Sequence, residues 1–192
     1  MKIIGLTGQS GSGKSLAANI LKEHGAYIID ADKIAHEVLL PGGLAYEEVI
    51  SNLGCGILDD DNFINRKKVA QIVFNDPEQL KRHVEATHKH IINKMHEEIN
   101  AAINYRIICL DAPLLTESGM HLICDEVWAI YADEAIRAKR IMKRDNLSAK
   151  EAERRFAAQS SFEKIAQYAD IIINNNSSPE EFAYEVKKRI AE

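Results

Sequence analysis

Five short apolar runs divide the chain, and segments with helical periodicity separate them. Each run is apolar at consecutive positions, which is typical of strands that are buried on both faces. Helical connections between such strands predict a parallel sheet covered by helices. The predicted strands are residues 2–7, 27–30, 106–111, 126–131 and 170–174.

Capping signals mark several of the predicted helices. The segment "DPEQ" at 76–79 offers an Asp cap followed by Pro in the first turn. Two further segments, "SAKE" at 148–151 and "SPEE" at 178–181, have the pattern of a capping box. The first helix follows a glycine-rich loop and ends at Gly25.

The spacing of the second and third strands is uneven, because 75 residues, 31–105, lie between them. A crossover with a single helix needs far fewer. We therefore predict an α/β protein with a three-layer fold around a five-stranded parallel sheet. Residues 1–30 and 106–192 form its core, and residues 31–105 form an inserted helical domain.

Composition narrows the possible partners. The net charge is -5, from 24 basic and 29 acidic residues, which is unfavourable for general binding of nucleic acid or membrane surfaces. The three cysteines include no C-x-x-C pair, and no apolar run has the length of a signal peptide or a membrane span. We expect a cytoplasmic protein without nucleic-acid or membrane partners. We also expect a monomer, although no sequence feature fixes the oligomeric state.

The most specific motif is "GQSGSGKS" at 8–15, which fits G-x-x-x-x-G-K-[ST] between a predicted strand and a predicted helix. Its glycines let successive backbone N–H groups point into one concavity, and the following helix adds its positive end. The lysine reaches the β- and γ-phosphates, and the last hydroxyl is a candidate Mg²⁺ ligand. The predicted nucleotide-binding residues are Gly8, Gly11, Ser12, Gly13, Lys14 and Ser15, with Ser15 on the metal.

The identity of the nucleotide follows from motifs that the chain lacks. Guanine recognition would need N-K-x-D, and the nearest string, "NKMH" at 93–96, fails at its fourth position. No D-x-x-G switch segment is present either. These absences favour ATP over GTP and a kinase over a switch.

Carboxylates follow two of the predicted strands. In open parallel sheets, ligands bind beyond the carboxyl ends of the strands. Of the pair in "DAD", Asp30 fits a helix cap, whereas we assign Asp32 to orient the acceptor hydroxyl and take its proton. Asp111, at the end of the third strand, is predicted to hold Mg²⁺ at the substrate site.

A basic segment spans residues 137–155, with eight basic and three acidic side chains and therefore a local balance of 8 − 3 = +5. A basic flap closing over ATP would neutralise the transferring phosphoryl group and exclude water. The alternative is a solvated amphipathic helix. We assign Arg144 and Arg155 to the flap, Arg144 with a catalytic role beside Lys14 and Asp32, and leave the other basic residues on the surface.

Taken together, these motifs resemble the dephospho-coenzyme A kinase family over nearly the whole chain. The similarity rests on the glycine loop and on five further segments in the family's order: "IIDADKIAHEVLLPGG", "FINRKKVAQIVF", "LDAPLLTESG", "RDNLSAKEAERRFAAQ" and "YADIIINNN". The loop alone indicates only a phosphate-loop protein. The second and fifth of the six segments, at their mutual spacing, are far more specific.

The resemblance implies ATP- and Mg²⁺-dependent phosphorylation of the ribose 3′-hydroxyl of dephospho-CoA. It implies a CoA domain matching 31–105 and a lid at about 140–165. On matched positions, Asp32 lies at the acceptor hydroxyl, Gly11–Ser15 hold the phosphates, and Arg144 and Arg155 are lid arginines. Arg66 is implied as a CoA-domain contact and Asn175 as a neighbour of adenine.

Three positions depart from the family pattern. His88 is followed by Lys89 where the family usually has Pro, Thr116 replaces an aromatic residue before Glu117, and Ser177 replaces a glycine. None of these removes a group needed for transfer. Two alternatives stay open: a small-molecule kinase of the same fold with another acceptor, and a nucleotide-dependent switch without phosphotransfer.

Overall fold

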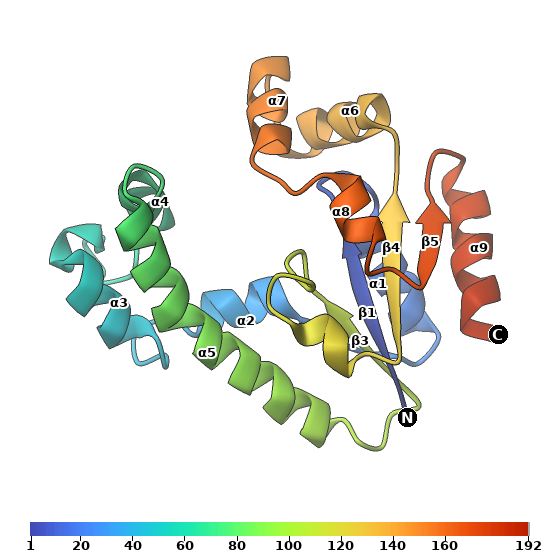
Figure 1. Ribbon diagram of the computed structural model, residues 1–192, viewed down its shortest axis with the longest axis horizontal. Coiled ribbons are helices and arrows are strands. Elements are labelled where there is room, and N and C mark those ends of the chain that lie inside the picture. The colour runs from blue at the N-terminus through green and yellow to red at the C-terminus, as the bar shows by residue number, and fades with distance from the viewer. Residues whose placement is uncertain (192) are drawn as a thin grey trace. The chain divides into compact units, whose positions relative to one another are not determined.

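The computed structural model describes residues 1–191, and its central feature is a five-stranded sheet (Figure 1). The strand order is β2-β3-β1-β4-β5, and the β1–β3, β1–β4 and β4–β5 pairings are parallel. The predicted five-stranded parallel sheet is confirmed, with each strand end within one residue of its predicted position. The strands are β1 Lys2–Gly8, β2 Tyr27–Asp30, β3 Ile107–Asp111, β4 Glu126–Tyr131 and β5 Ile171–Asn174.

One face of the sheet is covered by helices α1 (Lys14–Glu23) and α9 (Pro179–Ala191), which contact each other. Apolar side chains from both helices meet those of β1, β3, β4 and β5 in one buried cluster. Trp128 and Phe182 are the largest fully buried side chains of this core. The core fixes where β1 ends and α1 begins, and therefore where the glycine loop lies.

The other face is covered by the segment after β3, with the short helix η2 (Met120–Ile123), and by α8 (Phe162–Ala166). Gly5 of β1 is required for this packing. A Cβ at this position would lie 2.6 Å from Leu115 Cδ2 and 2.7 Å from Cys124 Sγ. The sheet is thus covered on both faces, as its continuous apolar runs predict.

Between β4 and β5 the chain forms three helices, of which the first two are α6 (Glu134–Asp145) and α7 (Ala149–Ala157) and the third is α8. Asn146 ends α6 in the left-handed conformation, with φ 54°. The predicted capping box at Ser148 and Glu151 is present in full and begins α7. The turn between α6 and α7 therefore begins with a left-handed residue and ends with a capping box, both of which are local sequence signals.

The chain separates into two compact units. The first is Met1–Ile29 together with the chain from Ala101 onward, and the second is Asp30–Asn100. The predicted caps are confirmed: Asp30 accepts from Lys33 N at 3.0 Å, and Asp76 accepts from Glu78 N at 2.9 Å. The elements of the second unit are α2 Ala31–Glu37, α3 Tyr46–Leu53, η1 Cys55–Ile57, α4 Arg66–Val73 and α5 Pro77–Ala101, whose last residue belongs to the first unit.

Candidate active site

The glycine loop joins β1 to α1 through a backbone conformation that two of its glycines make possible. Gly11 has φ 81° and Gly13 has φ 105°, values that residues with a Cβ rarely adopt. A Cβ on Gly13 would lie 2.0 Å from Asn175 Nδ2, and one on Gly11 would lie 2.7 Å from the Arg137 carbonyl oxygen. The loop is therefore wedged between α6 and the residue that follows β5.

Some backbone N–H groups of this loop donate to protein acceptors and others do not. Ser12 N donates to the Gln9 carbonyl at 3.0 Å, and Ser10 N donates to Gln159 Oε1 at 3.1 Å. Over residues 1–191, by contrast, the N–H groups of Gly11, Gly13, Lys14 and Ser15 have no protein acceptor. Unpartnered N–H groups at the start of a helix form a site for anionic oxygens.

A brace formed by the side chains of Asn175 and Arg140 supports the phosphate loop. The Asn175 side chain is buried, and Nδ2 donates to the Ser12 carbonyl at 2.7 Å. Arg140 completes the brace, with Nη2 donating to the Asn175 carbonyl at 3.0 Å and Nη1 to the Gly11 carbonyl at 3.3 Å. These contacts supply donors to the carbonyl oxygens of Gly11 and Ser12. Proximity of Asn175 to adenine remains a prediction.

Our expectation that Arg137 and Arg140 lie on the surface is wrong. Arg140 is part of the brace, and Arg137 is only 5% exposed, with its guanidinium carbon 4.5 Å from the centre of the Phe156 ring. Burial lowers the pKa of Arg137 below its ordinary value. The charge run itself does not reveal this burial, but the spacing could have, since Arg137 lies one helical turn before the buried Ile141 and shares its helix face.

Lys14 and Asp111 form an ion pair between the first residue of α1 and the last residue of β3. Both side chains are largely buried. The pairing follows from the sheet register, since Asp111 lies opposite Leu6 near the end of β1. It places the predicted phosphate-binding lysine next to the predicted magnesium ligand.

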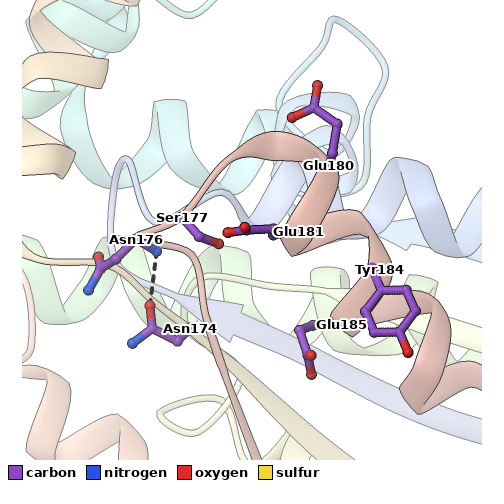
Figure 2. A pocket seen from close by; sticks show the side chains of 7 residues that line it. All are labelled: Asn174, Asn176, Ser177, Glu180, Glu181, Tyr184 and Glu185. Carbon is purple, nitrogen blue, oxygen red and sulfur yellow. Dashed lines mark hydrogen bonds between the residues drawn. The ribbon is translucent and has the colours of Figure 1, made fainter.

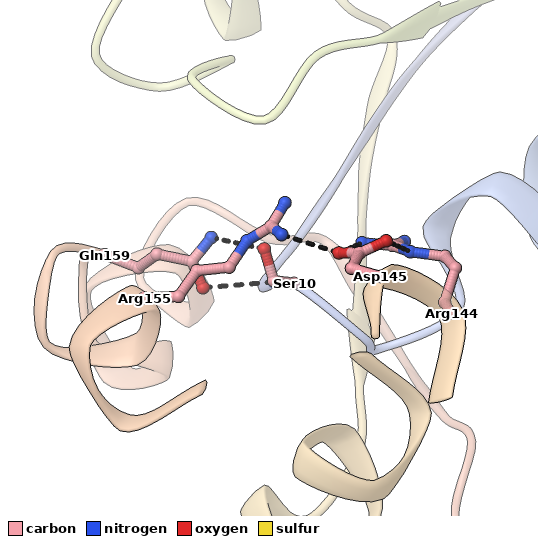
Figure 3. Close-up of polar contacts among 5 residues, drawn as sticks. All are labelled: Ser10, Arg144, Asp145, Arg155 and Gln159. Carbon is pink, nitrogen blue, oxygen red and sulfur yellow. Dashed lines mark hydrogen bonds and ion pairs between the residues drawn. The ribbon is translucent and has the colours of Figure 1, made fainter. Parts of the chain in front are cut away.

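Both predicted lid arginines bind a single carboxylate (Figure 3). Arg144 donates through Nε and Nη2 to Asp145 at 2.7 and 2.8 Å, and Arg155 Nη1 donates to Asp145 Oδ2 at 2.6 Å. The hydrogen bonds from Arg144, with a smaller contribution from Arg155, lower the pKa of Asp145 to about 2. The structure thus brings the two lid arginines together.

Two of the predicted site residues, Asp32 and Arg66, belong to the second unit. Asp32 is exposed in the first turn of α2, two residues beyond the end of β2, where the helix dipole favours a carboxylate. Arg66 is the first residue of α4, directly after the Asn65 cap. It lines a pocket of about 230 Å³ that also contains apolar side chains of α2, α4 and α5.

Besides Arg66, this pocket contains a histidine side chain. His83 lines it, and its Nδ1 is buried and has no hydrogen-bond partner in the described chain. Burial, with a smaller effect of the nearby His88, lowers the pKa of His83. A mostly apolar pocket with an arginine and an imidazole suits an elongated ligand with polar groups along an apolar chain.

A wider hollow of about 760 Å³ lies where β5 leads into α9 (Figure 2). Two of the residues that line it are hydrogen-bonded to each other, since Asn176 N donates to Asn174 Oδ1 at 2.9 Å. Glu180, Glu181 and Glu185 line it together with Ser177. None of its lining residues belongs to the phosphate loop, and its three carboxylates make it unfavourable for a triphosphate.

The fold and the loop together define the class of the protein: it is a phosphate-loop kinase. A family model described as dephospho-CoA kinase matches residues 2–181. The chain belongs to the dephospho-CoA kinase family. No helix in the described part of the chain has both the length and the apolar character needed to cross a membrane.

Individual relatives agree with the family model. The chain is 39% identical to the dephospho-CoA kinase of Aquifex aeolicus, covering 98% of this chain and 95% of that protein. The solved dephospho-CoA kinase from Campylobacter jejuni matches with a TM-score of 0.73 at 33% identity, covering 100% and 96%. Shikimate kinase from Acinetobacter baumannii, at 11% identity over 100% of this chain and 93% of that one, has a TM-score of 0.55 and shows the fold alone.

The shared carboxylate gives a pH-dependent prediction. Because the pKa of Asp145 is near 2 in the folded protein and ordinarily 3.8, the pairing stabilises the fold fully above about pH 5 and is lost as pH falls toward 2. Asp145→Asn should therefore lower the free energy of unfolding at about pH 7, and the difference from wild type should shrink by about pH 3.

Urea unfolding of both proteins across this range measures the difference. Glu153→Gln removes an exposed carboxylate of the same helix pair and controls for the change in net charge. A difference that stays constant with pH would contradict the pairing of Asp145 with the two arginines.

Proposed function

We propose that the protein transfers the γ-phosphoryl group of ATP to the ribose 3′-hydroxyl of dephospho-CoA, giving coenzyme A and ADP. Family membership supports the reaction. The observation that carries the proposal is the loop, in which Gly11, Gly13, Lys14 and Ser15 have N–H groups without a protein acceptor, next to the Lys14 ammonium. Such a nest binds phosphate oxygens by direct donation.

In this proposal Lys14 exchanges partners when ATP binds. Its ammonium group turns from Asp111 to the β- and γ-phosphates, the role that a lysine in this motif has. We assign the Asp111 carboxylate to the cation in the nucleotide-bound state. Neither charge is at any stage buried without a partner, which would be costly.

Mg²⁺ fits the oxygen donors present. Ser15 supplies a hydroxyl and Asp111 a carboxylate, and Mg²⁺ usually takes only one or two protein carboxylates, with water and substrate phosphates completing its shell. When bound, the ion supplies charge neutralisation at the β- and γ-oxygens.

Asp32 is the proposed base. It is an exposed carboxylate in the first turn of α2, immediately beyond β2. Asp30 is engaged as the helix cap, so Asp32, two residues further on, is the carboxylate that we assign to the acceptor. Asp32 orients the 3′-hydroxyl and takes its proton, a contribution of typically about 10²–10⁴ in rate.

Arg144 and Arg155 act on the transferring group from the lid. Arg144 holds Asp145 through two nitrogens, while Arg155 uses one nitrogen of its guanidinium for the same carboxylate. Positively charged groups that meet the γ-phosphoryl oxygens stabilise the charge that spreads over them during transfer. A closed lid also excludes water, the competing acceptor.

The pocket at Arg66 is proposed to receive the pantetheine arm of the acceptor. That arm is an elongated chain with amide groups, which matches the apolar walls and the unpartnered His83 Nδ1. The reaction as proposed uses one copy of the chain in the cytoplasm, and neither nucleic acid nor a membrane takes part.

Mass detection of coenzyme A after mixing the protein, Mg-ATP and dephospho-CoA tests the reaction. Parallel mixtures with adenosine, mononucleotides and shikimate separate it from other small-molecule kinases. ADP formation without any phosphorylated acceptor would support a nucleotide-dependent switch and overturn the proposal.

Asp32→Asn should keep ATP affinity and lower kcat by about 10²-fold or more, because the amide cannot take the proton. Asp30→Asn is the matched control, since asparagine caps a helix as well as aspartate does and should leave kcat near the wild-type value. Steady-state kinetics and calorimetry with Mg-ATP make the measurement. A kcat within about threefold of wild type for Asp32→Asn would show that another group is the base.

Arg66→Gln should raise KM for dephospho-CoA by about tenfold and leave KM for ATP unchanged, because it removes a charge-assisted contact from the acceptor pocket only. Lys67→Gln makes the same charge change at the next, exposed position of α4. Equal effects of the two substitutions on both KM values would contradict a specific contact at Arg66.

A further inference from the structure

The chain returns from the lid to the sheet directly beside the phosphate loop, and Gln159 makes the contact (Figure 3). Its Oε1 accepts from Ser10 N at 3.1 Å, and its Nε2 donates to Ser10 Oγ at 2.9 Å. One carboxamide thus binds both the backbone and the side chain of a single loop residue. A two-point contact of this kind fixes orientation as well as distance.

Neighbouring residues repeat the connection. Gln9 Nε2 donates to the Ser160 carbonyl at 2.9 Å, and Ser160 Oγ donates to Glu117 Oε1 at 3.0 Å. Two successive loop residues therefore bind Gln159 and Ser160, which form the return of the lid, the segment through which the chain leads back toward the sheet. Glu117 extends the network to the segment after β3, where Thr116 Oγ1 donates to its second oxygen at 2.8 Å.

The contact supplies an acceptor to one N–H group of the loop. Ser10 and Ser12 have their N–H groups taken, by Gln159 and by the Gln9 carbonyl, while those of Gly11 and Gly13 stay without a protein acceptor in the described chain. N–H groups with and without a protein acceptor thus alternate over residues 10–13. Without Gln159, the Ser10 N–H would lack its acceptor, and the adjoining peptide that carries the Gly11 N–H could rotate.

The lid is also attached to the loop at its other end. The backbone of Arg137 in α6 lies against Gly11, and Arg140 donates to the Gly11 carbonyl. Arg155, the lid arginine nearest in sequence to Gln159, is four residues away from it. Both ends of the lid are therefore fixed on the loop, and its arginines are placed by those ends.

We propose that Gln159 is a positioning residue that holds the Ser10 peptide so that the Gly11 and Gly13 N–H groups face the triphosphate, and that joins the return of the lid to the loop. The inference rests on the proposed function, because it takes the loop as the ATP site. Gln159 does not touch the reacting atoms. Its effect is on how the loop and the lid arginines are presented to ATP.

Gln159→Met tests the proposal, because methionine keeps the length of the side chain and removes both polar ends. We expect KM and Kd for Mg-ATP to rise about tenfold, with KM for dephospho-CoA within about twofold of wild type. Gln167→Met makes the same change at an exposed position before β5 and should leave all three constants unchanged. Circular dichroism and thermal melting confirm that each variant is folded.

A second variant tests the coupling itself. Ser10→Ala removes one of the two contacts, and it should raise Kd for ATP in the wild-type background and add nothing further in the Gln159→Met background. An ATP Kd for Gln159→Met within about twofold of wild type would overturn the proposal. Equal losses in ATP affinity, acceptor KM and kcat would overturn it too, since they would indicate general damage to the fold.

The design separates this inference from the proposed function. Calorimetry with Mg-ATP needs no acceptor, so the comparison of Gln159→Met with Gln167→Met stands even if wild-type protein fails to phosphorylate dephospho-CoA. Failure of wild-type turnover with intact ATP binding would overturn the acceptor assignment alone. Equal ATP binding by both variants and wild type would overturn the positioning role alone.

Discussion

The active site depends on one constraint, which is that every buried polar group of the backbone needs a partner. In the loop between β1 and α1, some backbone groups have protein partners and others have none. Asn175 and Arg140 bind carbonyl oxygens of the loop, and Gln159 binds the Ser10 N–H. The N–H groups of Gly11, Gly13, Lys14 and Ser15 have no acceptor in the described chain. In the proposed function, these four groups are the ones that bind the phosphate oxygens.

The charges around the loop are arranged on the same principle. Lys14 carries the positive charge that phosphate needs, and Asp111 compensates it across the end of the sheet. A buried lysine without a partner would be costly, so the carboxylate stabilises the charge of Lys14 in the folded chain. Because Asp111 ends β3 in register with β1, the pair is positioned by the sheet itself. The same strand order that brings β3 next to β1 thus supplies the counter-charge.

Sequence predicted the elements of the fold better than the contacts among their side chains. The strands were predictable because each is buried on both faces and reads as a continuous apolar run, and the caps at Asp30 and Ser148 are local signals. Arg140 gave no such signal, since its partners Gly11 and Asn175 are 129 and 35 residues away. Gln159 is a neutral amide whose partner lies 149 residues away. Side-chain partners separated by this distance are set by tertiary packing, which periodicity and motif spacing do not describe.

The arrangement of the lid arginines can be argued from charge alone. Two guanidinium groups close together repel each other, and Asp145 between them leaves a net charge of +1 for the three side chains where two arginines alone would have +2. Arg144 is bound to Asp145 by two nitrogens and Arg155 by one, so Arg155 has fewer hydrogen bonds to give up in the proposed contact with a phosphate. Each lid arginine lies four residues from a side chain that binds the phosphate loop, Arg144 from Arg140 and Arg155 from Gln159. The two arginines that share Asp145 are therefore both placed by contacts of the loop.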